Sequence, residues 1–261
     1  MTTPTTAGLT SSCDRGVLVI TLNKPKGNVL DAALMRELHD TLFAHRGDLS
    51  LKMVLLQAVG PHFSFGAAVD EHLPQQAPAM LRTFHALCRQ VASYPVPVAS
   101  LVQGRCMGGA FELVLCGHLL FVRPDAMLSC PEVQLAVFPP VLAAIGHLRL
   151  GGPLAEKMLL TGAALDADAA TQCGLATAAV AAHDATGAVF AWYSQHLQAL
   201  SAYAVRQAVA AVRRGSGLLV ALGAGLDAAE QQYLEHVLPS RDGQEGIAAF
   251  LARRKPEWTH A

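Results

Sequence analysis

A carboxylate beside paired glycines is the feature of this sequence that points most directly to chemistry. The segment GRCMGGAFELVLC, residues 104–116, places Gly108 and Gly109 directly before an apolar run that carries Glu112. An ionised carboxylate in an apolar segment is costly unless it is paired or used in a reaction. Glycines at a helix start allow backbone N–H groups to face a ligand closely, with the positive end of the helix dipole behind them. Such a group of residues could stabilise an enolate as it forms and then supply the proton that ends it.

Two further segments carry residues suited to the same chemistry. FSFGAAVDE, residues 63–71, has Gly66 in a position suited to a sharp turn. SCPEVQLAVFPP, residues 129–140, has Glu132 directly after a proline. Taken alone, Glu112 could equally belong to a structural ion pair, and Glu132 could simply flank a turn.

The order of these three motifs resembles the crotonase superfamily, also called the enoyl-CoA hydratase/isomerase family, over most of the chain from about residue 17. The resemblance implies an oxyanion hole for a CoA thioester carbonyl, formed by the backbone N–H groups of Ala67 and Gly109. It also implies that Glu112 and Glu132 are the catalytic pair, since their spacing fits the family. With that spacing, a catalytic role is favoured over the structural alternatives.

The resemblance further implies where the CoA and the acyl group lie. Lys26, Gly66 and Ala67 are the expected CoA-binding residues, because the turn after the first strand approaches the CoA nucleotide in this family. An ordinary solvated turn is the alternative for Lys26. Phe138 and Pro139 are the expected walls of the substrate pocket.

The sequence departs from ordinary enoyl-CoA hydratases near the second glutamate. The family usually has a Gly-rich segment where this chain has residues 138–141, Phe-Pro-Pro-Val, and often Asp where Ala68 stands. Both features resemble the cyclohexa-1,5-diene-1-carbonyl-CoA hydratases of aromatic degradation. A stiff, flat, apolar wall suits a ring better than a flexible chain. Ser129-Cys130 replaces the usual Gly-Gln, which leaves the exact acyl group open.

The resemblance implies a hydratase that adds water to an α,β-unsaturated acyl-CoA, and specifically to a cyclic dienoyl-CoA. Three alternatives remain: a general 2-enoyl-CoA hydratase or isomerase, a non-catalytic acyl-CoA-binding subunit, and a hydrolase with a Ser or Cys nucleophile. Cys106 and Cys130 are near the predicted site, but no adjacent histidine would activate either thiol. No metal site and no cofactor beyond the CoA of the substrate are expected.

The composition limits the class of protein. The 261 residues are 52% hydrophobic and 15% charged, which favours burial of surface between subunits. A formal net charge of −1 gives no broad electrostatic case for nucleic acid, and no apolar run is long enough to span a membrane. Residues 1–12 are polar and predict a flexible tail rather than a secretory signal. Six cysteines without C-x-x-C pairs favour reduced thiols and a cytoplasmic location.

The elements that must position these residues follow an α/β pattern. Strands are predicted over 16–22, 53–59, 98–102 and 119–122, with helices after Asp31, over 80–91 and from Gly108. The resemblance implies a crotonase-type spiral of repeated β-β-α turns with a C-terminal helical region. We expect a core over 1–190 and a helical oligomerisation region over 191–261, and therefore a homotrimer or a dimer of trimers.

Overall fold

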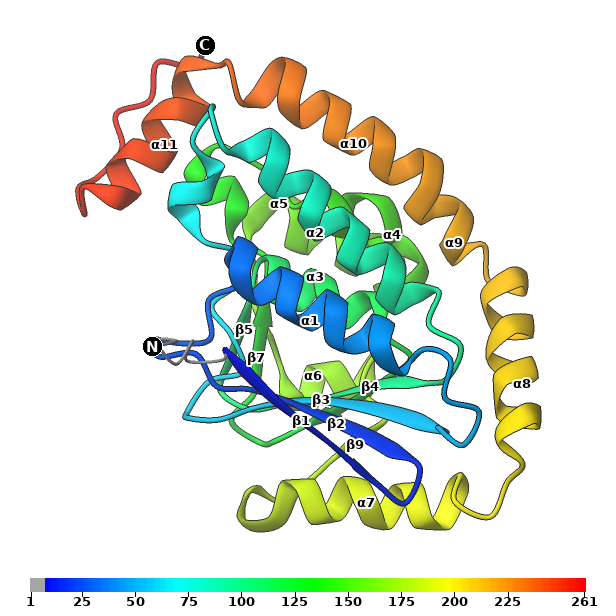
Figure 1. Cartoon of the computed structure of the whole chain (residues 1–261). Helices are drawn as coiled ribbons and strands as arrows, with labels where there is room; N and C mark the ends of the chain where they lie inside the picture. The colour runs from blue at the N-terminus through cyan, green and yellow to red at the C-terminus, as the bar shows by residue number, and fades with distance from the viewer. Residues whose placement is uncertain (1–7) are drawn as a thin grey trace, which may run out of the picture.

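Short strands, most of them apolar, form a six-stranded sheet in the computed structural model, which describes residues 8–261 (Figure 1). Its strand order is β1-β2-β3-β4-β6-β9, and every neighbouring pair is parallel except β1 with β2. The strands are β1 (Leu9–Asp14), β2 (Val17–Leu22), β3 (Met53–Ala58), β4 (Val98–Val102), β6 (Leu119–Val122) and β9 (Ala178–Ala179).

A smaller sheet of three strands runs beside the first. It has the order β5-β7-β8 and consists of β5 (Arg105–Met107), β7 (Met127–Ser129) and β8 (Leu165–Asp166). The chain passes from β4 to β5 and then into helix α3, and it passes from β6 to β7 in the next turn. Two isolated bridges, Leu30 with Ala67 and Ser64 with Cys106, join the preceding loops to this layer. The predicted spiral of β-β-α turns is confirmed.

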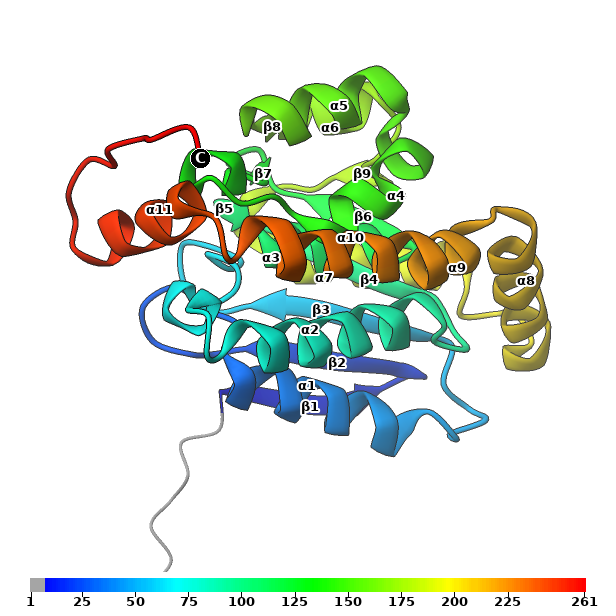
Figure 2. The same ribbon diagram turned by 90° about the horizontal axis from the view of Figure 1, so that it is seen from above.

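Eleven α-helices within the described residues surround the two sheets, some of them packed on other helices rather than on a sheet. They are α1 (Ala32–His45), α2 (Ala77–Ala92), α3 (Gly109–Cys116), α4 (Pro140–Leu150), α5 (Gly152–Thr161), α6 (Ala167–Gln172), α7 (Ala185–His196), α8 (Ala202–Gly215), α9 (Leu218–Val220), α10 (Leu226–Gln232) and α11 (Arg241–Leu251). As predicted, Asp31 caps α1, and its side chain accepts from the backbone N–H of Leu34 at 3.0 Å. Helices α9 and α10 are continuous through a π-helical turn and form one long rod beside α4 (Figure 2).

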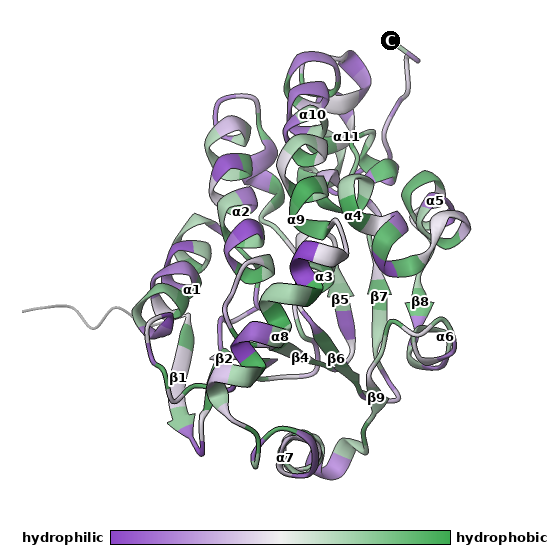
Figure 3. Ribbon diagram, turned by 90° about the vertical axis from the view of Figure 1, so that its right-hand side faces the viewer, coloured by the Kyte–Doolittle hydropathy of each residue, from purple (hydrophilic) through white to green (hydrophobic). Residues whose placement is uncertain are grey.

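Alternate residues of the central strands enter two separate cores. In β2, Leu18 and Ile20 pack into the large core shared with helices α1 to α4, whereas Val17 and Val19 pack on the opposite face with residues of α7. This alternation follows from the two-residue period of a strand. Figure 3 shows the resulting hydrophobic colouring of the central strands β4 and β6.

Two expectations about the chain's organisation need correction. The flexible tail predicted over 1–12 is wrong from Leu9 onward, because β1 pairs with β2 along its whole length; residues 1–7 lie outside the described residues. The sequence of β1 is polar because only Leu9 is buried, so no apolar alternation identifies the strand. The boundary predicted at residue 190 falls inside α7, which covers the outer face of the large sheet.

Between residues 8 and 261, no single helix is long and apolar enough to cross a bilayer. The two segments Ala202–Gly215 and Leu218–Val237, bent by 65° to one another, meet those criteria only in combination.

Candidate functional site

The predicted catalytic residues meet in one apolar cavity of about 140 Å³. Six predicted site residues line it: Ala67, Gly109, Glu112, Glu132, Phe138 and Pro139. They come from three separate loops and helix starts, which the smaller sheet brings together. The grouping predicted from the three motifs is therefore present in the structure.

Close packing of two backbone segments places Ala67 beside Gly109. Gly66 has a φ of +89°, and a Cβ atom there would lie 2.5 Å from the carbonyl oxygen of Met107, so only glycine fits. A Cβ atom built on Gly109 would lie 3.5 Å from that of Ala67. Neither the Ala67 nor the Gly109 N–H has an acceptor within residues 8–261. Gly109 is the first residue of α3, where N–H groups have no partner in the helix. Two adjacent amides therefore remain able to bind an oxyanion.

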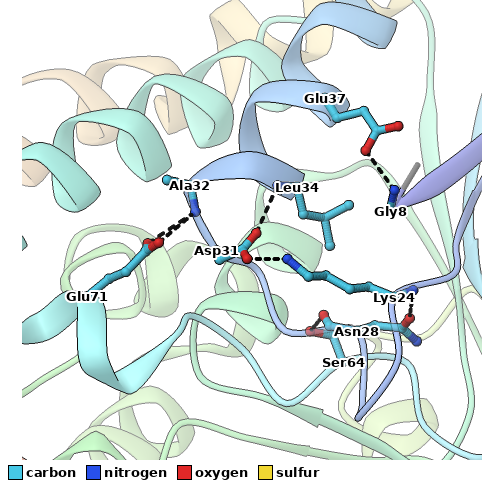
Figure 4. A network of polar contacts seen from close by, with 9 residues as sticks. All are labelled: Gly8, Lys24, Asn28, Asp31, Ala32, Leu34, Glu37, Ser64 and Glu71. Atoms are coloured by element: carbon cyan, nitrogen blue, oxygen red, sulfur yellow. Dashed lines mark hydrogen bonds and ion pairs between the residues drawn. The ribbon is translucent and has the colours of Figure 1, made fainter. Parts of the chain in front are cut away.

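A polar network fixes the segment that carries Ala67 (Figure 4). The buried side chain of Asn28 accepts from the Lys24 N–H at 2.8 Å and donates to the Phe63 carbonyl at 3.1 Å. The Ser64 hydroxyl donates to the Asn28 carbonyl at 2.7 Å, and the Glu71 carboxylate accepts from the first N–H of α1. These bonds tie residues 63–71 to the turn after β2 and to the start of α1, so the position of the Ala67 backbone is fixed.

Glu112 is a buried acid that also caps a helix. Its side chain is 3% exposed, and Oε1 accepts from the N–H groups of Val141 at 2.7 Å and Leu142 at 3.0 Å, in the first turn of α4. Burial raises the pKa of Glu112 well above that of a free glutamate, and the two N–H groups oppose this shift only in part. The carboxyl is thus held rigidly and titrates closer to neutral pH.

Glu132 has a different environment in the same cavity. It begins the short 3-10 helix Glu132–Leu135, and its Oε1 lies so close to Gly108 that a Cβ atom there would be 2.6 Å away. Its Oε2 is buried and has no hydrogen-bond partner among the described residues. Burial, followed by the charge of Glu112, raises the pKa of Glu132. Two such neighbours do not ionise independently, because the charge of one carboxylate disfavours ionisation of the other.

Other predicted residues lie outside this cavity. Lys26 is exposed, in a turn whose Gly27 carbonyl accepts from the N–H of Phe65 at the cavity wall. Gly66 does not line the cavity but determines the position of Ala67. The CoA-binding roles of these residues stay predictions.

The cysteines near the site show no feature of a nucleophile. Cys106 and Cys130 are fully buried, and neither lines the cavity. Burial raises the pKa of both thiols well above the ordinary range, which disfavours the reactive thiolate. This observation weighs against the cysteine-hydrolase alternative.

The C-terminal helices contribute cavity residues that the motifs did not indicate. Tyr233, Ile247 and Phe250 complete the wall, together with Phe84 of α2. Residues 227–238 have the periodicity of an amphipathic helix, but this pattern cannot distinguish a side chain in the core from one beside a cavity.

Comparisons with known proteins agree with this geometry. A family model described as enoyl-CoA hydratase/isomerase matches residues 12–261. The chain is 39% identical over 245 residues to the cyclohexa-1,5-dienecarbonyl-CoA hydratase of Thauera aromatica, covering 94% of this chain and 93% of that protein. It is 31% identical over 248 residues to the 2,3-dehydroadipyl-CoA hydratase of Escherichia coli (strain K12), covering 93% and 94%.

A solved structure is similar over nearly the whole chain. The enoyl-CoA hydratase from Mycobacterium avium subsp. paratuberculosis K-10 superposes with a TM-score of 0.84 at 26% identity, covering 97% of this chain and 99% of that one. The sequence motifs, the fold and the relatives give the same assignment. The chain therefore belongs to the enoyl-CoA hydratase/isomerase family, and it is an enzyme of the hydro-lyase class.

Proposed function

We propose that this enzyme adds water to a cyclic dienoyl-CoA thioester of aromatic degradation. The observation that carries the proposal is the arrangement of two buried carboxyl groups and two free amides, those of Ala67 and Gly109, around one small apolar cavity. A general 2-enoyl-CoA hydratase or isomerase is the second candidate, favoured by the similarity to the 2,3-dehydroadipyl-CoA hydratase.

The proposed reaction uses each of these groups once. The thioester oxygen accepts hydrogen bonds from the Ala67 and Gly109 amides, which stabilise negative charge as the enolate forms. A water molecule lies between the two carboxyl groups. Glu112 takes one of its protons while the oxygen bonds to the β-carbon, and Glu132 donates its own proton to the α-carbon. One water is added, and the two glutamates exchange their protonation states.

The assignment of acid and base rests on the different partners of the two carboxyl groups. Two main-chain N–H groups bind Glu112 Oε1 and favour its ionised form, whereas Glu132 Oε2 has no donor and its protonated form is favoured. Glu112 therefore suits the base and Glu132 the acid.

The size and shape of the cavity support a ring as the acyl group. A cavity of about 150 Å³ with apolar walls accommodates a benzene molecule, and this cavity measures about 140 Å³. The Phe138 ring packs edge-on against Tyr233 at 5.8 Å, and Pro139 and Pro140 stiffen the same wall. A flat ring fills such a space with little loss of conformational freedom, whereas a long chain must fix several torsions.

A panel of CoA thioesters tests the proposal. We expect kcat/KM for a cyclic dienoyl-CoA to exceed that for crotonyl-CoA by roughly ten- to a few hundredfold, the range that apolar shape discrimination supplies. Equal kcat/KM values for the two thioesters would favour a general 2-enoyl-CoA hydratase. No hydration of any thioester, with binding retained, would favour a non-catalytic subunit.

The proposal extends to the assembly of the enzyme, its location and its contacts with CoA. We propose a homotrimer or a dimer of trimers, supported by apolar side chains that α8 and α9 leave exposed, among them Tyr203, Val212 and Val220. We also propose a cytoplasmic location, CoA contacts from Lys26, and a reaction that needs no cofactor besides the CoA of the substrate.

A further inference from the structure

The hydroxyl group of Tyr233 differs from those of the other buried tyrosines. Tyr94 donates to the Leu42 carbonyl at 2.9 Å, and Tyr193 donates to the Arg15 carbonyl at 2.6 Å. Tyr233 is 1% exposed, yet its hydroxyl has no partner within residues 8–261. Buried hydroxyl groups are almost always hydrogen-bonded, so an unpaired one indicates a partner that binds there.

This hydroxyl belongs to the lining of the catalytic cavity. The polar side chains in that lining are His72, Glu112, Glu132 and Tyr233. His72 already uses its Nδ1 donor on the Ala68 carbonyl, at 2.9 Å, and burial lowers its pKa, so its second nitrogen is an acceptor. Pro139 and Pro140 have no N–H to offer. Among the described lining side chains, Tyr233 is therefore the one with an unused donor besides the protonated acid.

The helix that carries Tyr233 is fixed to the rest of the site. Tyr233 begins a π-helical turn, a feature common at functional sites. One turn earlier, Glu230 binds His85 Nδ1 at 2.5 Å, and Asp227 pairs with Arg89. His85 and Arg89 both belong to α2, which also supplies Phe84 to the cavity. These pairs hold the tyrosine at a defined position relative to the two glutamates.

We propose that the Tyr233 hydroxyl donates a hydrogen bond to the oxygen of the water that is added, and afterwards to the new hydroxyl group of the product. The inference rests on the proposed hydration at this site. The O–H groups of the water point to the carboxyl groups, one lone pair accepts from Tyr233, and the other lone pair faces the β-carbon. Burial and the two nearby carboxyl groups raise the pKa of Tyr233, so the phenol stays a donor at neutral pH.

The variant Y233F tests this role, because it removes the hydroxyl and keeps the ring against Phe138. We expect kcat/KM to fall about tenfold or more, as for the loss of one hydrogen bond made during the reaction. Affinity for the hydroxylated product should fall by a similar factor. Affinity for a saturated acyl-CoA without a hydroxyl should not change.

Stability separates this role from a structural one. Since the hydroxyl makes no hydrogen bond in the free protein, Y233F should keep or raise the Tm. The matched control Y193F loses the bond to Arg15, so it should lower the Tm and keep kcat/KM. Wild-type kcat/KM and product affinity in Y233F, or a lowered Tm, would overturn the inference. If the wild-type enzyme hydrates no acyl-CoA, the proposed function itself is wrong.

Discussion

Glu112 and Glu132 share a cavity but differ in what binds them, and this difference makes a direct test possible. Glutamine at either position keeps the shape and still offers an oxygen acceptor, so E112Q retains a cap for α4. We expect both E112Q and E132Q to fold with a wild-type circular dichroism spectrum and to lose kcat by about a hundredfold or more, the usual size of general acid–base catalysis. Near-normal rates in both variants would exclude the two-glutamate mechanism.

The raised pKa of Glu132 also predicts how stability depends on pH. At pH values between the pKa of a free glutamate and the raised pKa of Glu132 in the folded state, the unfolded chain has lost a proton that the folded protein keeps. The free energy of unfolding therefore falls as the pH rises through this window. Because glutamine cannot ionise, the stability of E132Q relative to the wild type should rise, by on the order of 1–3 kcal/mol, as the pH rises from the free value of 4.5 to about 8.

Urea unfolding at several pH values measures this difference. A gap between E132Q and the wild type that does not change with pH would show that the folded state does not hold this proton.

At the scale of elements, the start of α3 positions both the Gly109 amide and the Glu132 carboxyl group. Gly108 has a φ of +52°, and a Cβ atom there would lie 2.6 Å from Glu132 Oε1. G108A should displace the carboxyl and lower kcat by about tenfold or more, since small misplacements of reacting groups are costly.

A control variant separates the displacement of the Glu132 carboxyl from the effect of backbone strain. Gly174 has a φ of +77° with no atom within 4 Å of the added Cβ position. G174A also places a Cβ atom on a residue of positive φ but meets no neighbour, so it should lower the Tm without loss of kcat. Equal losses of kcat in G108A and G174A would show that contact with Glu132 is not the cause.

Some elements could be predicted from the sequence because their own residues determine them. Strands β2, β3 and β4 are apolar runs, and α1 has a cap and regular apolar positions. By contrast, β8 and β9 have two residues each, too few for any period to be visible. They are strands because β7 and β6 provide a partner, which is a property of the fold rather than of the segment.

At the scale of the whole molecule, the C-terminal helices cover the site and complete it. Truncation after Gly215 removes Tyr233, Ile247 and Phe250 from the cavity wall and uncovers the apolar face of α4. We expect the truncated chain to aggregate and the full chain to sediment as a trimer or hexamer. A stable monomer of the full chain at micromolar concentration would contradict the assembly.

The same organisation explains which part of the site the sequence revealed. Glu112, Glu132, Ala67 and Gly109 belong to short contiguous motifs, in which an unusual residue stands out against its neighbours. Tyr233 directly follows α10 in a stretch with amphipathic periodicity, and its place in the cavity depends on the contacts of α10 with α2. Long-range packing of this kind leaves no local pattern in the sequence.

The cavity that holds the two carboxyl groups is closed by segments that come much later in the chain than the motifs of Glu112 and Glu132. The ribosome synthesises the segments that carry both glutamates and Ala67 well before it reaches residues 233–250. A nascent chain therefore exposes these carboxyl groups to water, where each has the proton affinity of an ordinary glutamate. The burial that raises the pKa of both carboxyl groups is complete only once α10 and α11 have docked, so the proposed acid–base chemistry depends on the docking of these two helices.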